Sequence, residues 1–350
     1  MSHGHTARLT RRTLIAATLL AAGLAASSAT AADQALIDAA RKEGTVVWYS
    51  SLIVNQLVRP VAEAFEAKYG IKVEYSRTPA GEMALKLLNE IKADSVQADA
   101  FDGNSAFFQV MPLDNLVAYS PDAAAAYPAE LKDPNGRFHA INLAILTTAV
   151  NTSLVPEAEW PRTYDDLLDP KWKGKMAWTT DLTPNGPPGF IGNILKVYGE
   201  DKGMDYLKKL AGQDVVKVPA SQRVVLDQVI AGEHQLGLMT FNHHSVISAA
   251  KGAPVVWLKM EPLVSTGNYV GLLKNSPHPN AGKLFVDFIL SEEGQKVFQA
   301  ANYLPAHPGV PAAEPTLKPE AGHFKVTVIT NEEALADLPK WTKIYKDLFQ

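Results

Sequence analysis

The feature that most constrains this chain is an alternation of short apolar runs and amphipathic stretches over residues 45–103. Residues 45–49 form a nearly continuous apolar run, which is typical of a strand buried on both faces of a sheet. The rest of the alternation predicts helices at 55–68 and 81–93 and strands at 71–75 and 98–101. Strands separated by helices at this spacing predict a mainly parallel sheet with helices on both faces.

A parallel sheet also predicts where a ligand binds, because ligands of such sheets lie beyond the carboxyl ends of the strands. The residues predicted there are Ser50, Ser51, Arg77 and Asn104. Hydroxyls and free N–H groups at a strand-to-helix turn suit an anion, and the guanidinium fork of Arg77 suits a carboxylate or phosphate. The alternatives are a plain turn and cap for the serines, and a solvated Arg77 or a partner for Glu82.

Composition bounds the class of protein. The chain has 350 residues, enough for two domains, and 47% of them are hydrophobic while 20% are charged, a globular composition. The formal net charge of -4 gives no reason to expect a nucleic acid partner. There are no cysteines, which excludes disulfides, thiolate catalysis and Cys-ligated metals, and is compatible with an oxidising compartment.

Residues 1–31 are predicted to be an export signal. Three arginines, Arg8, Arg11 and Arg12, precede an apolar core at 14–26, and an A-x-A cleavage site follows at 29–31. The arginine pair permits twin-arginine export, and a retained anchor is the alternative, although the apolar run is short for a membrane span. The segment carries no acidic residue, so the remaining chain has a net charge of -7 and is expected to be soluble in the periplasm.

Four stretches together are more specific than any single motif. Residues 164–178 (YDDLLDPKWKGKMAW) predict a short helix, a stop at Pro170, a turn and a strand. The others are 44–51 (GTVVWYSS), 81–103 (GEMALKLLNEIKADSVQADAFDG) and 291–308 (SEEGQKVFQAANYLPAHP). In their order and spacing along the chain, the four stretches resemble the ferric-ion-binding branch of the periplasmic solute-binding proteins of ABC importers.

The resemblance implies an α/β, two-lobe periplasmic-binding-protein fold of type II. Each lobe would be a mixed, mainly parallel sheet flanked by helices, and a hinge of two strands at 139–151 and 266–273 would join the lobes. The first lobe would comprise 32–142 plus 270–350, and the second lobe 143–269. The implied partners are a small-molecule solute in the interlobe cleft and an ABC permease in the inner membrane, with no cofactor.

The resemblance also indicates second-lobe residues that close over the solute. The segments 179–181 and 187–189 match the loop and helix start of this family, which singles out Asp181 and Gly189. Ser221 and Arg223 begin a predicted helix at 221–231 and offer a further anion contact. A purely structural role is the alternative for each of these residues.

The segment 241–245 departs from the family. Ferric-binding members carry two adjacent tyrosines near this point, whereas this chain reads Phe241-Asn242-His243-His244-Ser245. Phenolates suit Fe(III), while neutral imidazoles suit softer divalent metals, and neighbouring residues seldom both reach one ion. We therefore predict that Asn242 and His243 hydrogen-bond a solute, with Asn242 also capping a helix. A metal site at His243 and His244 is the alternative.

The leading functional hypothesis is a periplasmic receptor that captures a small anionic solute, either an organic acid or a phosphonate or phosphate ester. The alternatives are a carrier of iron(III) or another metal and, ranked low, an enzyme on the same scaffold. No G-x-S-x-G, H-E-x-x-H or P-loop string occurs. We therefore predict a monomer that binds its solute without chemical change and has no nucleic acid partner.

Overall fold

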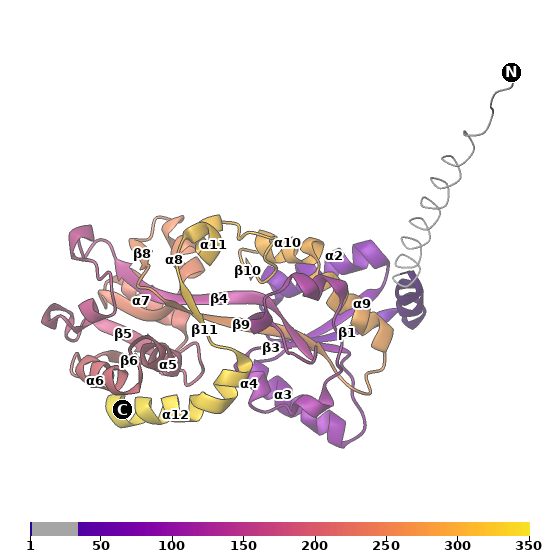
Figure 1. Ribbon diagram of the computed structural model, residues 1–350, viewed down its shortest axis with the longest axis horizontal. Coiled ribbons are helices and arrows are strands. Elements are labelled where there is room, and N and C mark those ends of the chain that lie inside the picture. Colours follow the sequence, from indigo (N-terminus) through magenta and orange to yellow (C-terminus); the bar gives the residue numbers. More distant parts are fainter. Residues whose placement is uncertain (2–33) are drawn as a thin grey trace.

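The computed structural model describes Met1 and residues 34–350, so the predicted export signal lies outside the described residues. Its strands form a sheet in the order β2-β1-β3-β9-β4-β7-β5-β6, with β8, β10 and β11 paired at the sides. Two large hydrophobic clusters flank this sheet, one toward each end. The protein is therefore an α/β structure with two lobes along one long axis (Figure 1). In the described part of the chain, no helix is both long and apolar enough to cross a bilayer.

The first lobe is built on parallel strands that alternate with helices, as the sequence predicts. Strand β1 pairs in parallel with both β2 and β3. The buried face of α2 carries Val61, Ala62 and Phe65, and Gly70 ends this helix with a φ of 69° in the left-handed region. The elements of this lobe are β1 (Thr45–Ser50), α2 (Arg59–Tyr69), β2 (Lys72–Arg77), α3 (Ala80–Lys92), β3 (Ala100–Gly103), α4 (Ser105–Phe108), α9 (Pro279–Leu290) and α10 (Glu292–Ala300).

The second lobe repeats the same architecture. Strand β5 pairs in parallel with β6 and β7, and the buried side chains of Trp172 and Trp178 lie in its core. A short 3-10 helix at Asp165–Leu168 ends at Asp169, as Pro170 predicts. The elements are β5 (Met176–Thr179), α5 (Pro187–Tyr198), α6 (Glu200–Ala211), β6 (Val216–Val218), α7 (Gln222–Ala231), β7 (Leu236–Phe241), α8 (Asn242–Ala249) and β8 (Val255–Leu258).

Two long antiparallel strands join the lobes, which confirms the predicted hinge. They are β4 (Phe138–Asn151) and β9 (Leu263–Leu272), and each contributes to both cores. Strand β4 places Ile141 in the first cluster and Val150 in the second, while β9 places Val264 in the second and Val270 in the first. Figure 1 shows both strands running along the long axis between the two groups of helices.

The C-terminal part of the chain makes a third passage between the lobes. After β10 (Leu304–Pro305) it follows α11 (Pro319–Gly322) and β11 (Val326–Val328), which pairs with β9, and then enters α12 (Asn331–Phe349). Helix α12 buries Leu338, Trp341, Tyr345 and Phe349 in the second-lobe core. The expected assignment of 270–350 to the first lobe is therefore wrong for α12. Its apolar stripe predicts a buried helix but does not specify which core buries it.

Candidate functional site

A cavity of about 390 Å³ lies where the two lobes meet at the hinge. The first lobe, the hinge strands and the second lobe all contribute to its walls. Most of its polar groups are uncharged amides, hydroxyls and imidazoles. The polar residues that line it are Ser51, Gln56, Asn104, Asn142, Asn185, His243, His244, Thr266, Asn268 and Tyr303.

The carboxylate of Asp102 fixes the first-lobe wall of the cavity. Asp102 is fully buried at the end of β3, and its Oδ1 accepts hydrogen bonds from the Ser51 amide at 3.0 Å and the Ser51 hydroxyl at 2.7 Å. The same oxygen accepts from Nδ2 of Asn268 on β9 at 3.0 Å. Burial raises the pKa of Asp102, and hydrogen bonds from Ser50, Asn268 and Ser51 oppose that rise. The buried Asp102 side chain therefore holds both Ser51 in the first-lobe wall and Asn268 on a hinge strand.

A hydrogen-bonded loop at 181–186, just before α5, contributes Asn185 to the second-lobe wall. Asp181 accepts from the backbone and hydroxyl of Thr183 at 3.0 and 2.9 Å and from Nε2 of Gln222 at 3.1 Å. Gln222 also donates to the backbone carbonyl of Asn185 at 3.2 Å. The Oδ1 of Asn185 then accepts from the Thr266 hydroxyl at 2.6 Å. This chain of bonds connects the loop to hinge strand β9.

Two helices begin at the cavity, one from each lobe. Helix α3 starts at Ala80 after Pro79, and α8 starts at Asn242 after Phe241, and no side chain caps either end. Pro79, Ala80, Phe241 and His243 all line the cavity. The first N–H groups of a helix have no partner within it, and this end carries the positive pole of the helix dipole. Both lobes therefore present backbone donors suited to an anion.

His243 and His244 form an aromatic cluster with Phe241 at the start of α8. The two imidazole centroids are 4.4 Å apart and lie 5.6 and 5.3 Å from the Phe241 ring. Burial lowers the pKa of His243 to about 3, and the neighbouring His244 adds to the effect. Burial and the positive charge of Arg223 lower the pKa of His244 to about 4. Both rings are therefore neutral near pH 7, and their Nδ1 atoms have no hydrogen-bond partner among the described residues.

These pKa values predict acid sensitivity. An unfolded histidine binds its proton near pH 6.5, whereas the folded state resists protonation down to about pH 4 for His244 and about pH 3 for His243. The free energy of unfolding should therefore fall as the pH drops below 6.5, by at most about 1.4 kcal/mol per pH unit for each histidine. Water reaching the partly exposed rings reduces this slope.

Urea denaturation at several pH values between 7.5 and 4.5 measures this effect. The double variant His243→Gln, His244→Gln should lose less stability over this range than the parent protein. Parallel curves for the two proteins would show that these histidines do not carry the pH dependence. Replacement of His323, which lies outside the cavity lining, serves as the control.

Three of the predicted solute-binding residues, Ser51, Asn104 and His243, line the cavity, together with His244. Asn104 also caps α4, where its side chain accepts from the Ala106 amide at 3.0 Å. Ser50 is fully buried beneath the wall, and its hydroxyl accepts from the Leu52 amide at 3.1 Å. Of the predicted first-lobe residues, Ser51 and Asn104 thus line the cavity, and Ser50 lies in the layer behind them.

The other predicted residues do not line the cavity. Asn242 is the first residue of α8 rather than its cap, and its amide donates to the Leu317 carbonyl at 3.0 Å. A Cβ on Gly189 would overlap the Pro184 carbonyl, so this glycine permits close packing of the first turn of α5 against the preceding loop. Arg223 donates to Asp227 and Ser248. The remaining residues outside the lining are Arg77 and Ser221, both exposed, and Asp181, which organises the loop.

The amides of the hinge strands and of the second-lobe loop are site residues that the sequence does not predict. Asn142 on β4, Asn268 on β9 and Asn185 all line the cavity. Only Asn142 offers a signal, because it interrupts the otherwise apolar run at 140–146, and a buried amide is unfavourable without a partner. The Oδ1 of Asn142 is buried and has no hydrogen-bond partner in the described part of the chain.

Known proteins resemble this chain in sequence. A family model described as bacterial extracellular solute-binding protein matches residues 95–328. The Fe(3+)-binding periplasmic protein of Serratia marcescens is 25% identical over 298 residues, covering 80% of this chain and 84% of the relative. A protein of Salmonella paratyphi A, provisionally named a 2-aminoethylphosphonate-binding periplasmic protein, is 23% identical over 294 residues, 81% of each chain.

A solved structure shares the fold. The periplasmic binding protein AfuA of Actinobacillus pleuropneumoniae, with fructose-6-phosphate bound, matches with a TM-score of 0.70 and 24% sequence identity. The match covers 87% of this chain and 98% of that protein. This likeness supports the two-lobe fold of type II periplasmic binding proteins that the sequence resemblance implies.

Proposed function

Because the chain belongs to the bacterial extracellular solute-binding proteins, we propose that it captures a small organic anion between its two lobes. The anion carries a carboxylate, phosphonate or phosphate group, and the loaded protein delivers it in the periplasm to the membrane permease of an ABC importer. The relatives of this family are periplasmic proteins named for binding iron or a phosphonate, which supports a transport role rather than catalysis.

The observation that carries the anionic assignment is the pair of uncapped helix ends at the cavity. The N-termini of α3 and α8 approach it from opposite lobes, so an anion between them satisfies donors from both. The protein is net acidic, so the attraction must be local. Burial raises the pKa of Tyr303 at the cavity, and the positive charge of Arg77 opposes that rise, so Arg77 adds to the local positive potential.

Three observations favour an organic anion over a bare metal ion. The cavity of about 390 Å³ has room for a small molecule. Among the described residues there is no group of three or more His, Cys, Asp or Glu side chains suited to hold a metal. Finally, the amides of Asn142, Asn185 and Asn268 can hydrogen-bond hydroxyl or amino groups of an organic body.

The cavity also favours binding over catalysis. The Ser51 hydroxyl donates its hydrogen bond to the buried carboxylate of Asp102, at 2.7 Å, rather than to a histidine. A serine nucleophile requires an adjacent base that accepts this proton and passes it on. A carboxylate buried beneath two strands, bonded also to a hinge amide, fits a positioning role. We propose that the protein works as a monomer and releases its solute unchanged.

A thermal-shift screen tests the solute class. We expect phosphonates, phosphate esters or carboxylates to raise the melting temperature, whereas neutral sugars, polyamines and metal salts should not. Ligand at about a hundred times its dissociation constant stabilises a protein by roughly 2.7 kcal/mol. Stabilisation by neutral or cationic solutes alone would contradict the proposal.

Ala80→Pro tests the helix-end contact directly. Proline is tolerated at the first helical position, where it removes one N–H group and leaves the helix intact. Ala80 begins α3 at the cavity, and its replacement should weaken anion binding about tenfold, the effect of roughly 1.4 kcal/mol. Glu200→Pro at the start of α6, away from the cavity, is the matched control and should bind normally. Equal affinity for both variants would rule out α3 as an anion contact.

A further inference from the structure

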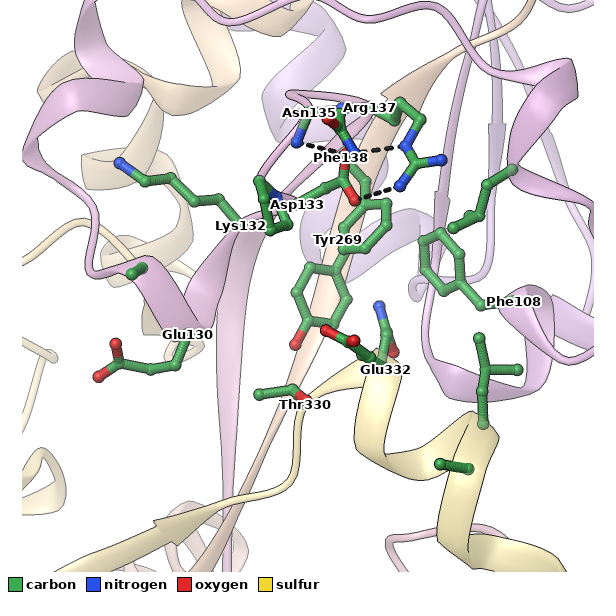
Figure 2. Close-up of a pocket in the computed structure, with 16 residues that line it drawn as sticks. Phe108, Glu130, Lys132, Asp133, Asn135, Arg137, Phe138, Tyr269, Thr330 and Glu332 are labelled. Atoms are coloured by element: carbon green, nitrogen blue, oxygen red, sulfur yellow. Dashed lines mark hydrogen bonds and ion pairs between the residues drawn. The ribbon is translucent and has the colours of Figure 1, made fainter.

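A second cavity, of about 650 Å³, lies between the segment 129–138 and the start of α12 (Figure 2). It shares no lining residue with the solute cavity. Its walls come from Phe108 of α4, Phe138 of β4, Tyr269 of β9 and Leu335 of α12. The volume falls within the range of small-molecule sites, so the chemistry of its lining decides what it can hold.

Three aromatic rings form one side of this second cavity. The ring centroids of Phe108 and Phe138 are 4.6 Å apart, and that of Tyr269 lies 5.9 and 5.4 Å from them in edge-to-face contacts. Leu113 and Leu335 face the same space, and Leu335 remains 40% exposed on the surface of α12. Aromatic rings present large apolar surfaces with defined geometry. The cavity therefore suits an apolar, preferably cyclic, molecule.

Two buried polar side chains line the same cavity without a partner. Tyr269 is 2% exposed and Asn331 is 5% exposed, and neither the tyrosine hydroxyl nor Nδ2 of Asn331 has a hydrogen-bond partner among the described residues. Figure 2 shows the hydroxyl end of Tyr269 directed toward Thr330 and Glu332 at the start of α12. A buried unsatisfied donor is costly, and an acceptor oxygen of a ligand would remove that cost.

The charges around the second cavity disfavour an anion. Both lining cations are engaged: Arg137 binds Asp133 through two bonds of 2.8 and 2.7 Å, and Nζ of Lys132 donates to the Ala124 carbonyl at 2.9 Å. The carboxylates of Glu130 and Glu332 also line the cavity. With Asp133, three acids face two cations, so a carboxylate or phosphate would enter a lining of net negative charge.

We propose that this cavity is a second binding site, which takes a neutral cyclic or aromatic molecule bearing one acceptor oxygen. The ring packs against Phe108, Phe138 and Tyr269. The oxygen accepts hydrogen bonds from the Tyr269 hydroxyl and the Asn331 amide. The two cavities differ in the charge of the molecule they bind: this cavity favours a neutral molecule, whereas the solute cavity favours an anion.

Calorimetric titration of the full chain with acetophenone tests the proposal, since this probe has one ring and one acceptor oxygen. Benzoate is the anionic probe of similar shape. We expect saturable one-to-one binding of acetophenone and at least tenfold weaker binding of benzoate. Absence of saturable acetophenone binding up to its solubility limit, or tighter binding of benzoate, would overturn the proposal.

Variants locate the bound probe. Ala336→Trp fills the cavity from an exposed position on α12 and should abolish acetophenone binding, whereas Ala67→Trp, exposed on α2 and outside this lining, should not. Tyr269→Phe removes only the unpartnered hydroxyl, so the protein should stay folded by circular dichroism while affinity falls by up to tenfold. Unchanged binding in Ala336→Trp would place the probe elsewhere and overturn the assignment. Unchanged binding in Tyr269→Phe would exclude the tyrosine hydroxyl as its donor.

Discussion

Trp341→Ala should lower the free energy of unfolding by about 3–5 kcal/mol, the range for truncating a large aromatic side chain in a core. Trp341 is 3% exposed and packs with the second-lobe cluster. Its ring lies so close to α5 that a Cβ on Gly192 would overlap it. No neighbouring side chain can readily fill the space left by the indole. Urea denaturation of the parent and the variant measures the difference.

Lys340→Ala provides the control for this prediction. Lys340 precedes Trp341 on α12 and pairs with Glu200, and both side chains are exposed. Exposed ion pairs contribute at most about 1 kcal/mol, so this variant should unfold almost as the parent does. A loss of less than about 1 kcal/mol in Trp341→Ala would show that α12 contributes little to the second-lobe core.

Asp102→Ala should weaken solute binding by about a hundredfold, or roughly 2.7 kcal/mol, and destabilise the protein by about 3 kcal/mol. The substitution leaves the Ser51 amide, the Ser51 hydroxyl and the Asn268 amide without their common acceptor. Both the first-lobe wall and the hinge wall of the solute cavity then lose their fixed positions. Titration with the best anion from the solute screen measures the affinity.

Asp102→Asn separates hydrogen bonding from charge, because its carbonyl oxygen can still accept. We expect it to retain most of the affinity that Asp102→Ala loses. Burial raises the pKa of Asp102, so its protonated form favours the folded state, and this contribution is lost as the pH rises from about 3.8 through the raised value. The parent should therefore gain stability relative to Asp102→Asn as the pH falls. Equal affinity for the alanine variant and the parent would contradict this role of Asp102.

The parts of the fold that the sequence predicted depend on local periodicity. The alternation over 45–103 appears as β1, β2 and β3 with their intervening helices, shifted by a few residues. The hinge strands were also found, because β4 and β9 are long extended runs. A pattern of this kind depends only on neighbouring residues and on the face that each side chain occupies.

The parts that could not be predicted depend on contacts between distant segments. The periodicity of α12 predicts an apolar face, but the complementary surface belongs to α5 and to Trp178. The sequence indicates a solute contact at Gly189, whereas its close neighbour is Pro184, and that contact exists only once the loop has folded against the start of α5. Asn268 follows three small or polar residues, so nothing in its own segment distinguishes it, and only the folded arrangement of the strands brings it to the cavity.

Helix α12, at the end of the third passage between the lobes, belongs to the second-lobe core but is the last element to be synthesised. Trp178 packs against Phe190 from its own segment of sequence and against Phe349 at the C-terminus, with ring centroids 5.9 and 4.9 Å apart. Such distant pairs form slowly, because a long loop must close before they contribute. A nascent chain that still lacks the nineteen residues of α12 leaves this tryptophan partly uncovered. We therefore expect the second lobe to complete its core last, and an incomplete chain to expose apolar surface that favours aggregation.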